Sequence, residues 1–203
     1  MKKYFSLCIV IIMLISMNGC SKNSTTDIEN TTFDEAYTQF EEFTNPGEYL
    51  KSLCSKVKID NTEFSLPCTF EKMSELFTLT YKDESLSLEG YTTKTYEVFT
   101  LEDKYFGIIT FVDYDESNDE SWLLFNDYRK KDISNNDKTN FIISDFTSGK
   151  TKLSEIVAKL GVGYVIDPSM EKGRLYIFED GTLAIVYEDD TAIEFHICFD
   201  IKK

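Results

Sequence analysis

Few side chains in this sequence have the type and spacing that catalysis requires. The single histidine, His196, alternates with apolar residues in the last predicted strand, so we expect it on the solvent side of that strand. We interpret it as a surface histidine rather than a general base. Ser55 and Lys58 have the Ser-x-x-Lys spacing of penicillin-binding enzymes, but they fall in a predicted strand and lack the partner motifs Ser-Asp-Asn and Lys-Thr-Gly. We therefore predict no catalytic residues and a protein that is not an enzyme.

An acidic loop over residues 113–120 contains enough carboxylates to suggest calcium. Calcium loops of the EF-hand type need a glycine at the sixth position and a bidentate acid at the twelfth, which here are Asn118 and Leu124. We interpret the segment as a solvated hairpin loop and predict neither a metal site nor a cofactor. The 36 acidic residues make chance carboxylate pairs abundant, so no pair identifies a hydrolase by itself.

The cysteines suggest one disulfide bond. Cys54 and Cys68 flank a predicted hairpin centred on Asn61, so they could face one another across its open end. In a compartment that permits disulfides they are a candidate pair, which would leave Cys198 reduced. The alternative is that all three are free thiols.

The N-terminus has the form of a secretory signal peptide over residues 1–19. A lysine pair precedes an apolar run over residues 4–15, which is too short to span a bilayer, and Gly19-Cys20 closes the segment. This pattern resembles the signal peptides of bacterial lipoproteins, although Met17 and Asn18 depart from the commoner Leu-Ala or Leu-Ser. The resemblance implies that Cys20 is diacylated and that a lipid anchor holds the protein on the extracytoplasmic face of the cell membrane. The alternatives are an ordinary secreted protein or an uncleaved anchor.

The net charge limits the partners. Loss of residues 1–19 removes two lysines and no acids, so the formal charge moves from -15 to -17. Such a surface repels nucleic acid and anionic headgroups, and we expect membrane contact through the lipid anchor and no nucleic-acid partner. Residues 20–31 are predicted to be the lipidated cysteine and a flexible spacer. Residues 32–55 are predicted to form an N-terminal helical segment, or else a partly ordered extension of the spacer.

Residues 136–203 are predicted to form a compact α+β unit. Apolar positions over residues 151–160 follow one helical stripe that begins after the candidate cap Thr151 and ends at Gly161. Three strands are expected over residues 174–178, 182–187 and 191–199, and the Asp180-Gly181 pair predicts a tight hairpin. The last strand is expected to be open on the face of His196 and packed against the helix on the other.

Residues 56–135 show a similar order, with a helix capped by Thr69 and three strands near residues 96–101, 105–114 and 121–128. Residues 99–109 align with residues 176–186. The predicted fold class is therefore α+β, with two tandem units, each a helix plus a three-stranded antiparallel sheet, and with the two sheets side by side.

The stretches Glu63–Met73 and Gly149–Gly161, with the strands that follow them, resemble a group of Gram-positive surface lipoproteins. These are built from two units similar to the β-lactamase inhibitor protein fold and the small BamE-type lipoproteins. The resemblance covers roughly residues 56–200 and is carried by helix caps and strand order. It implies binding or assembly, with no catalytic residues to carry over and no inhibition of a β-lactamase.

Aromatic side chains occupy both registers of the strands in the first unit. Trp122 and Tyr128, beyond the acidic loop, are our candidates for a binding face, because Trp and Tyr contribute most per residue to recognition. The alternative is that both are core residues beneath the N-terminal helix. We expect a membrane-tethered module that binds or assembles an unknown envelope protein or glycan. The alternative function is a cell-envelope hydrolase using carboxylates that the sequence does not identify.

Overall fold

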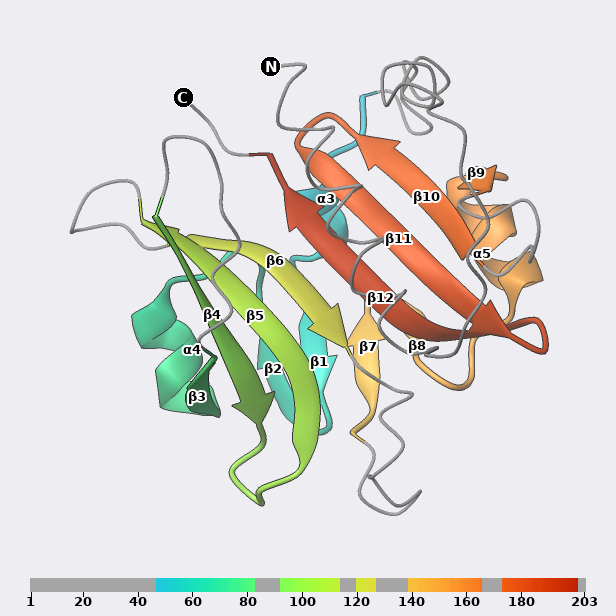
Figure 1. Cartoon of the computed structure of the whole chain (residues 1–203). Helices are drawn as coiled ribbons and strands as arrows, with labels where there is room; N and C mark the ends of the chain where they lie inside the picture. The colour runs from blue at the N-terminus through green and yellow to red at the C-terminus, as the bar shows by residue number, and fades with distance from the viewer. Residues whose placement is uncertain (1–46, 83–91, 114–119, 127–138, 166–172, 201–203) are drawn as a thin grey trace, which may run out of the picture.

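The computed structural model describes residues 47–82, 92–113, 120–126, 139–165 and 173–200 (Figure 1). The helices within these ranges are α3 (Leu50–Leu53), α4 (Phe70–Leu76) and α5 (Leu153–Leu160). The strands are β1 (Val57–Ile59), β2 (Thr62–Phe64), β3 (Thr78–Lys82), β4 (Thr92–Phe99), β5 (Tyr105–Asp113), β6 (Glu120–Asn126), β7 (Phe141–Ile143), β8 (Phe146–Thr147), β9 (Tyr164–Val165), β10 (Gly173–Phe178), β11 (Gly181–Glu188) and β12 (Thr191–Phe199). No helix in this part of the chain is long and apolar enough to cross a membrane.

The strands form two antiparallel sheets, which confirms a mixed α+β fold. The smaller sheet has the order β2-β1-β7-β8, and the larger has the order β3-β4-β5-β6-β12-β11-β10-β9. In the larger sheet Leu124 of β6 lies opposite Ile197 of β12, and in the smaller sheet Lys58 of β1 lies opposite Ile142 of β7. Each sheet therefore joins a strand from the first half of the chain to a strand from the second.

The core lies between the two sheets. Figure 1 shows the smaller sheet behind the larger one, with α4 near one end and α5 near the other. Phe141 of β7 is fully buried, and its ring centroid lies 5.2 Å from that of Phe106 in β5 and 5.7 Å from that of Phe195 in β12. One aromatic side chain of the smaller sheet therefore packs against both halves of the larger sheet.

Helix α4 begins where the sequence predicts. The Thr69 hydroxyl accepts a hydrogen bond from the backbone N–H of Lys72 at 3.2 Å, so Thr69 is the N-cap. Met73 is fully buried, and the ring of Phe70 packs at 5.6 Å on that of Phe111. The apolar side of α4 therefore covers the first half of the larger sheet.

Helix α5 starts one residue later than predicted. Its N-cap is Lys152, whose N–H donates to the Glu155 carboxylate at 2.8 Å, whereas the Thr151 hydroxyl accepts from the N–H of Thr147. The helix ends at Gly161, which has a φ of 81°. The predicted stop is confirmed and the predicted cap is off by one position.

The number of strands and their division into sheets differ from the prediction. Residues 78–82, where no strand was predicted, form the edge strand β3. Each half of the chain contributes four strands to the larger sheet, and β6 pairs with β12 to make one continuous sheet instead of two separate ones. Of the predicted N-terminal helical segment, residues 50–53 form α3, and residues 32–46 lie outside the described residues.

The predicted open face of the last strand is wrong. Glu194 and His196 of β12 are 3% and 1% exposed, and His196 Nε2 lies 3.6 Å from Glu194 Oε2. The prediction failed because it treated polar alternation as a solvent face, although a polar side chain can be buried when another polar group lies beside it. His196 is therefore not a surface histidine.

Candidate functional site

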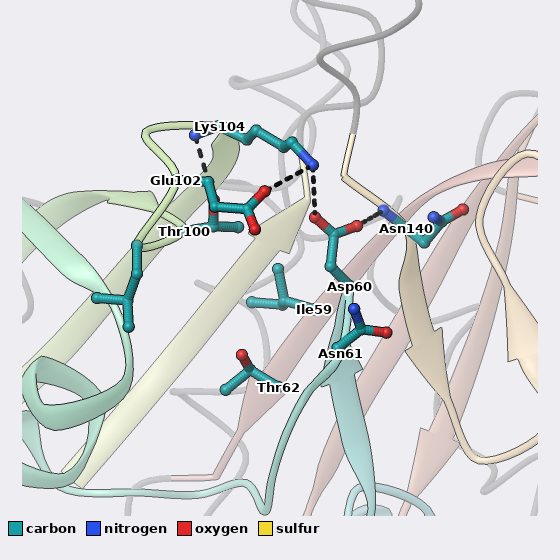
Figure 2. Close-up of a pocket in the computed structure, with 9 residues that line it drawn as sticks. Ile59, Asp60, Asn61, Thr62, Thr100, Glu102, Lys104 and Asn140 are labelled. Atoms are coloured by element: carbon teal, nitrogen blue, oxygen red, sulfur yellow. Dashed lines mark hydrogen bonds and ion pairs between the residues drawn. The ribbon is translucent and has the colours of Figure 1, made fainter.

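A pocket of about 400 Å³ opens where two turns of the first half meet the segment that enters β7 (Figure 2). One turn joins β1 to β2 and the other joins β4 to β5. The residues that line the pocket are Ile59, Asp60, Asn61, Thr62, Thr100, Leu101, Glu102, Lys104 and Asn140. The pocket is therefore lined mainly by polar side chains on the ends of strands.

Backbone geometry fixes both turns. Asp60 and Asp103 have φ angles of 52° and 59°, in the left-handed region that Asp tolerates better than most residues. In the β4–β5 turn the N–H of Thr100 donates to the carbonyl of Lys104 at 2.8 Å. The N–H of Lys104 donates in return to the Thr100 hydroxyl at 3.2 Å. These bonds hold the lining residues in place before any ligand arrives.

Asp60 ties the two walls of the pocket together. Its N–H donates to the carbonyl of Asn140 at 2.8 Å, and its Oδ1 accepts from the N–H of Asn140 at 2.7 Å. Asn140 leads directly into β7, so these bonds continue the pairing of β1 with β7 by one residue. The pocket therefore lies at the seam between the two halves of the smaller sheet.

Lys104 carries the only positive charge in the lining, and Figure 2 shows its ammonium between two carboxylates. Its Nζ lies 3.1 Å from Glu102 Oε2 and 3.7 Å from Asp60 Oδ2. The hydrogen bond with Glu102 and the charges of Glu102 and Asp60 raise the pKa of Lys104. The ammonium is therefore protonated at neutral pH, and the lining carries two negative charges against one positive.

Three lining side chains have unused hydrogen-bonding capacity. The amides of Asn61 and Asn140 and the hydroxyl of Thr62 form no hydrogen bond with the described part of the chain. Each amide offers two donors and an acceptor, and the hydroxyl offers both. At the rim, Leu101 is 75% exposed. The site can therefore bind a polar ligand that also presents a small apolar group.

The described residues contain no group of three or more His, Cys, Asp or Glu side chains placed to hold a metal ion. The nine lining residues include neither histidine nor cysteine. The carboxylate of Asp60 is already engaged by Asn140 and Lys104, and that of Glu102 by Lys104. These contacts shape the pocket and place no nucleophile beside a base.

A second Glu-Asp turn, between β10 and β11, holds the start of α3. Asp180 Oδ1 accepts a hydrogen bond from the N–H of Leu50, and its Oδ2 accepts from the N–H of Lys51 at 3.4 Å. Glu179 Oε1 accepts from the N–H of Gly47 at 3.2 Å. The carboxylates of this turn thereby satisfy N–H groups that have no partner within the helix.

Most of the residues predicted as a site are not placed by the structure. Trp122 belongs to β6, but its side chain lies outside the described residues, as do the whole of Tyr128 and Cys20. The pocket was not predicted, although Asn61 was placed at the centre of its hairpin. The missing information was the pairing of β1 with β7, since no local pattern brings Asn140 to Asp60.

The predicted disulfide is wrong, because no bond joins Cys54 to Cys68. Cys54 caps the C-terminus of α3 and is fully buried, while Cys68 lies half-buried before α4. Burial raises the pKa of the Cys54 thiol, and the charge of Asp180 acts in the same direction. Cys198 was predicted to be reduced and is instead disulfide-bonded, with neither Cys54 nor Cys68 as its partner.

Comparison with protein families, with curated proteins and with solved structures gives no match to this chain.

Proposed function

We propose that this protein is a non-catalytic binding or assembly module that recognises an envelope protein or a glycan. The observation that carries the proposal is the pocket at the β1–β2 and β4–β5 turns. It offers the unused amides of Asn61 and Asn140 on backbone that is already fixed by hydrogen bonds. Convergent polar groups on a preformed scaffold favour ligand binding, because little conformational entropy is lost when the ligand arrives.

The contacts of the pocket acids favour binding over hydrolysis. A general acid or base must exchange a proton with the substrate, whereas Asp60 and Glu102 both face the ammonium of Lys104.

If the protein were instead a hydrolase, purified protein should release reducing ends from envelope glycan, and Asp60→Asn should abolish the release. We expect no release from either protein.

We also propose that the module is anchored by lipid at Cys20 on the extracytoplasmic face of the cell membrane. The Gly19-Cys20 sequence after an apolar run supports this location. Cys20→Ala should abolish acyl labelling and membrane retention together, and persistent labelling would refute the anchor. A lipidated thiol cannot form a disulfide, so non-reducing peptide mapping of the mature protein tests Cys20 as the partner of Cys198.

We infer that the fold is a tandem duplication of one unit containing a hairpin, a helix and four strands. The orders β1-β2-α4-β3-β4-β5-β6 and β7-β8-α5-β9-β10-β11-β12 follow one plan, and strands at the same place in the plan pair with each other, β1 with β7 and β6 with β12. An approximate two-fold relation between the units accounts for both pairings. On this plan the β4–β5 turn is equivalent to the β10–β11 turn.

Photocrosslinking in the host cell tests the proposed function. A benzophenone side chain at Asn61 should give a covalent adduct with the ligand, whereas the same group at Lys72, which is exposed on α4, should give none. Equal adducts at both positions, or none at either, would contradict a binding site at the pocket. A third probe at Trp122 tests the proposed face of Trp122 and Tyr128, where an adduct without one at Asn61 would move the site to β6.

A further inference from the structure

We propose that strand β3 pairs with the β3 strand of a second copy of this chain, so that the larger sheets of two molecules join at their edges. β3 lies at the outer end of the larger sheet, beside α4 (Figure 1). None of the residues that line the pocket belongs to β3. The proposal is therefore independent of the proposed function, and the partner that it adds is the chain itself.

β3 is the longest of the four strands that end the two sheets. The smaller sheet ends at β2, with three residues, and at β8, with two. The larger sheet ends at β9, with two residues, and at β3, with five. Proteins protect sheet edges with short strands, prolines, bulges or charges. β3 contains no proline, pairs with β4 without a bulge and carries one charge, that of Lys82 at its end. It is therefore an edge that can accept another strand.

β3 is exposed on both faces and hydrogen-bonded on one side. Thr78 and Thr80 are exposed on one face, and Tyr81 is 55% exposed on the other. In the described part of the chain, the backbone of residues 78–81 forms hydrogen bonds only with β4. In an antiparallel ladder, every second residue of an edge strand points its N–H and carbonyl away from the neighbouring strand. Those groups of β3 can therefore bond to a further strand.

The sequence of β3 is complementary to itself in an antiparallel pair centred on Thr80. In this register Leu79 lies opposite Tyr81 of the second copy, on the face where the Tyr81 ring packs at 5.7 Å on that of Tyr96. Lys82 lies opposite Thr78 of the second copy instead of another lysine. Threonine pairs stabilise adjacent strands, and like charges directly opposite destabilise them. A two-fold contact in this register therefore brings no like charges together along β3.

The chain already joins sheet edges in this way. β6 of the first half and β12 of the second pair through three positions, centred on Leu124 and Ile197, whereas β3 offers five. Two separate molecules also lose translational freedom when they associate, and each copy carries a formal charge of -15. A five-residue strand pair buries less than the roughly 1,200–2,000 Å² of a stable interface. We therefore expect a weak dimer that strengthens with salt, because salt screens the repulsion between the copies.

Sedimentation of the whole chain, extracted in mild detergent as its host cell produces it, tests the proposal. The dimer fraction should rise with protein concentration and with added salt. Thr80→Lys and Thr80→Glu should each weaken the dimer by about tenfold, because like charges then lie opposite each other. An equal mixture of the two variants should regain the dimer, because opposite charges then meet. Mixing would not rescue misfolded variants, so recovery also shows that both fold.

Ser52→Lys is the control, because it adds the same charge at an exposed residue of α3 and should not weaken the dimer. A wild-type chain that stays monomeric at every concentration overturns the proposal, even if β3 then pairs with a strand of another protein. Thr80 variants that dimerise like the wild type overturn it as well. So does a mixture of the two variants that stays monomeric.

Discussion

The β4–β5 and β10–β11 turns contain the same Glu-Asp pair and make different contacts. In the second, Asp180 and Glu179 are committed to the N–H groups of the α3 segment, and Phe178 is buried. In the first, Glu102 pairs with Lys104 and the neighbouring Leu101 remains exposed. The acidic pair itself is unchanged, but the residue that follows it is Lys104 in the first turn and Gly181 in the second, where the side chain of Leu50 packs. An acidic hairpin turn is therefore a structural anchor in one half and an available surface in the other.

The largest contrast is expected at the residue before each acidic pair. Phe178→Ala should cost about 3–5 kcal/mol in the free energy of unfolding, because it leaves a cavity in the core. Leu101→Ala should cost less than about 0.5 kcal/mol, as exposed substitutions usually do. Urea unfolding of the two variants measures both values. A large loss for Leu101→Ala would show that the first turn is covered, and the comparison would then fail.

Gly181→Ala should be the next most damaging change. A Cβ at this position would lie 2.3 Å from the carbonyl oxygen of Cys198 and would also meet Leu50, so β11, β12 and α3 must all move. We expect a loss of about 3 kcal/mol. Gly161→Ala is the control, because its Cβ meets nothing within 4 Å and only its backbone angles, a φ of 81° with a ψ of -172°, oppose it, at about 1–3 kcal/mol. Equal losses from the two variants, compared by thermal unfolding, would contradict the close approach.

Asp180→Asn should lower stability by about 1 kcal/mol, since it replaces a charged acceptor of two backbone N–H groups by a neutral one. Asp103→Asn, in the equivalent turn, should change stability by less than about 0.5 kcal/mol. Asn tolerates the left-handed φ of Asp103, so the control adds no backbone strain. Amide exchange at Leu50 and Lys51 should accelerate in the first variant alone.

The smallest effect concerns pH. Partial desolvation of an otherwise exposed carboxyl, and then the charge of Asp180, raises the pKa of Asp200 above its ordinary value of 3.8. A raised folded-state pKa gives stability that is present at low pH and is lost as pH rises through that pKa. Asp200→Asn should therefore raise Tm slightly at pH 7, and the gain should disappear below about pH 4. A gain that is the same at both pH values would show that ionisation of Asp200 is not its cause.

Local patterns predicted the local elements well. Thr69 is the cap of α4, Gly161 ends α5, and the hairpin at Gly181 forms with Phe178 opposite it. In each case the determining contacts lie within a few residues of the signal, so the sequence contains the information directly.

Features that depend on distant pairing were not predictable in the same way. The position of Cys54 results from contacts between segments more than a hundred residues apart, such as Leu50 with Asp180. His196 lies in β12, whose pairing with β6 of the first half was not predicted either. The pocket has the same origin, since Asn140 reaches Asp60 only through the pairing of β7 with β1. The spacing of apolar residues along a strand indicates which of its faces is buried, but it does not indicate which other strand lies beside it.

The hydrogen bond between the N–H of Gly47 and the carboxylate of Glu179 also affects how the molecule responds to mechanical force. A pull applied at Gly47 meets the hydrogen bonds of Glu179 and Asp180 before it reaches β1. If these give way, the seven residues Gly47–Leu53 can extend to a span of at most about 25 Å while both sheets stay intact, and the gain in length is this span less the distance that they cover in the fold. If the proposed lipid anchor holds, this release would lengthen the connection to the membrane before force reaches the pocket.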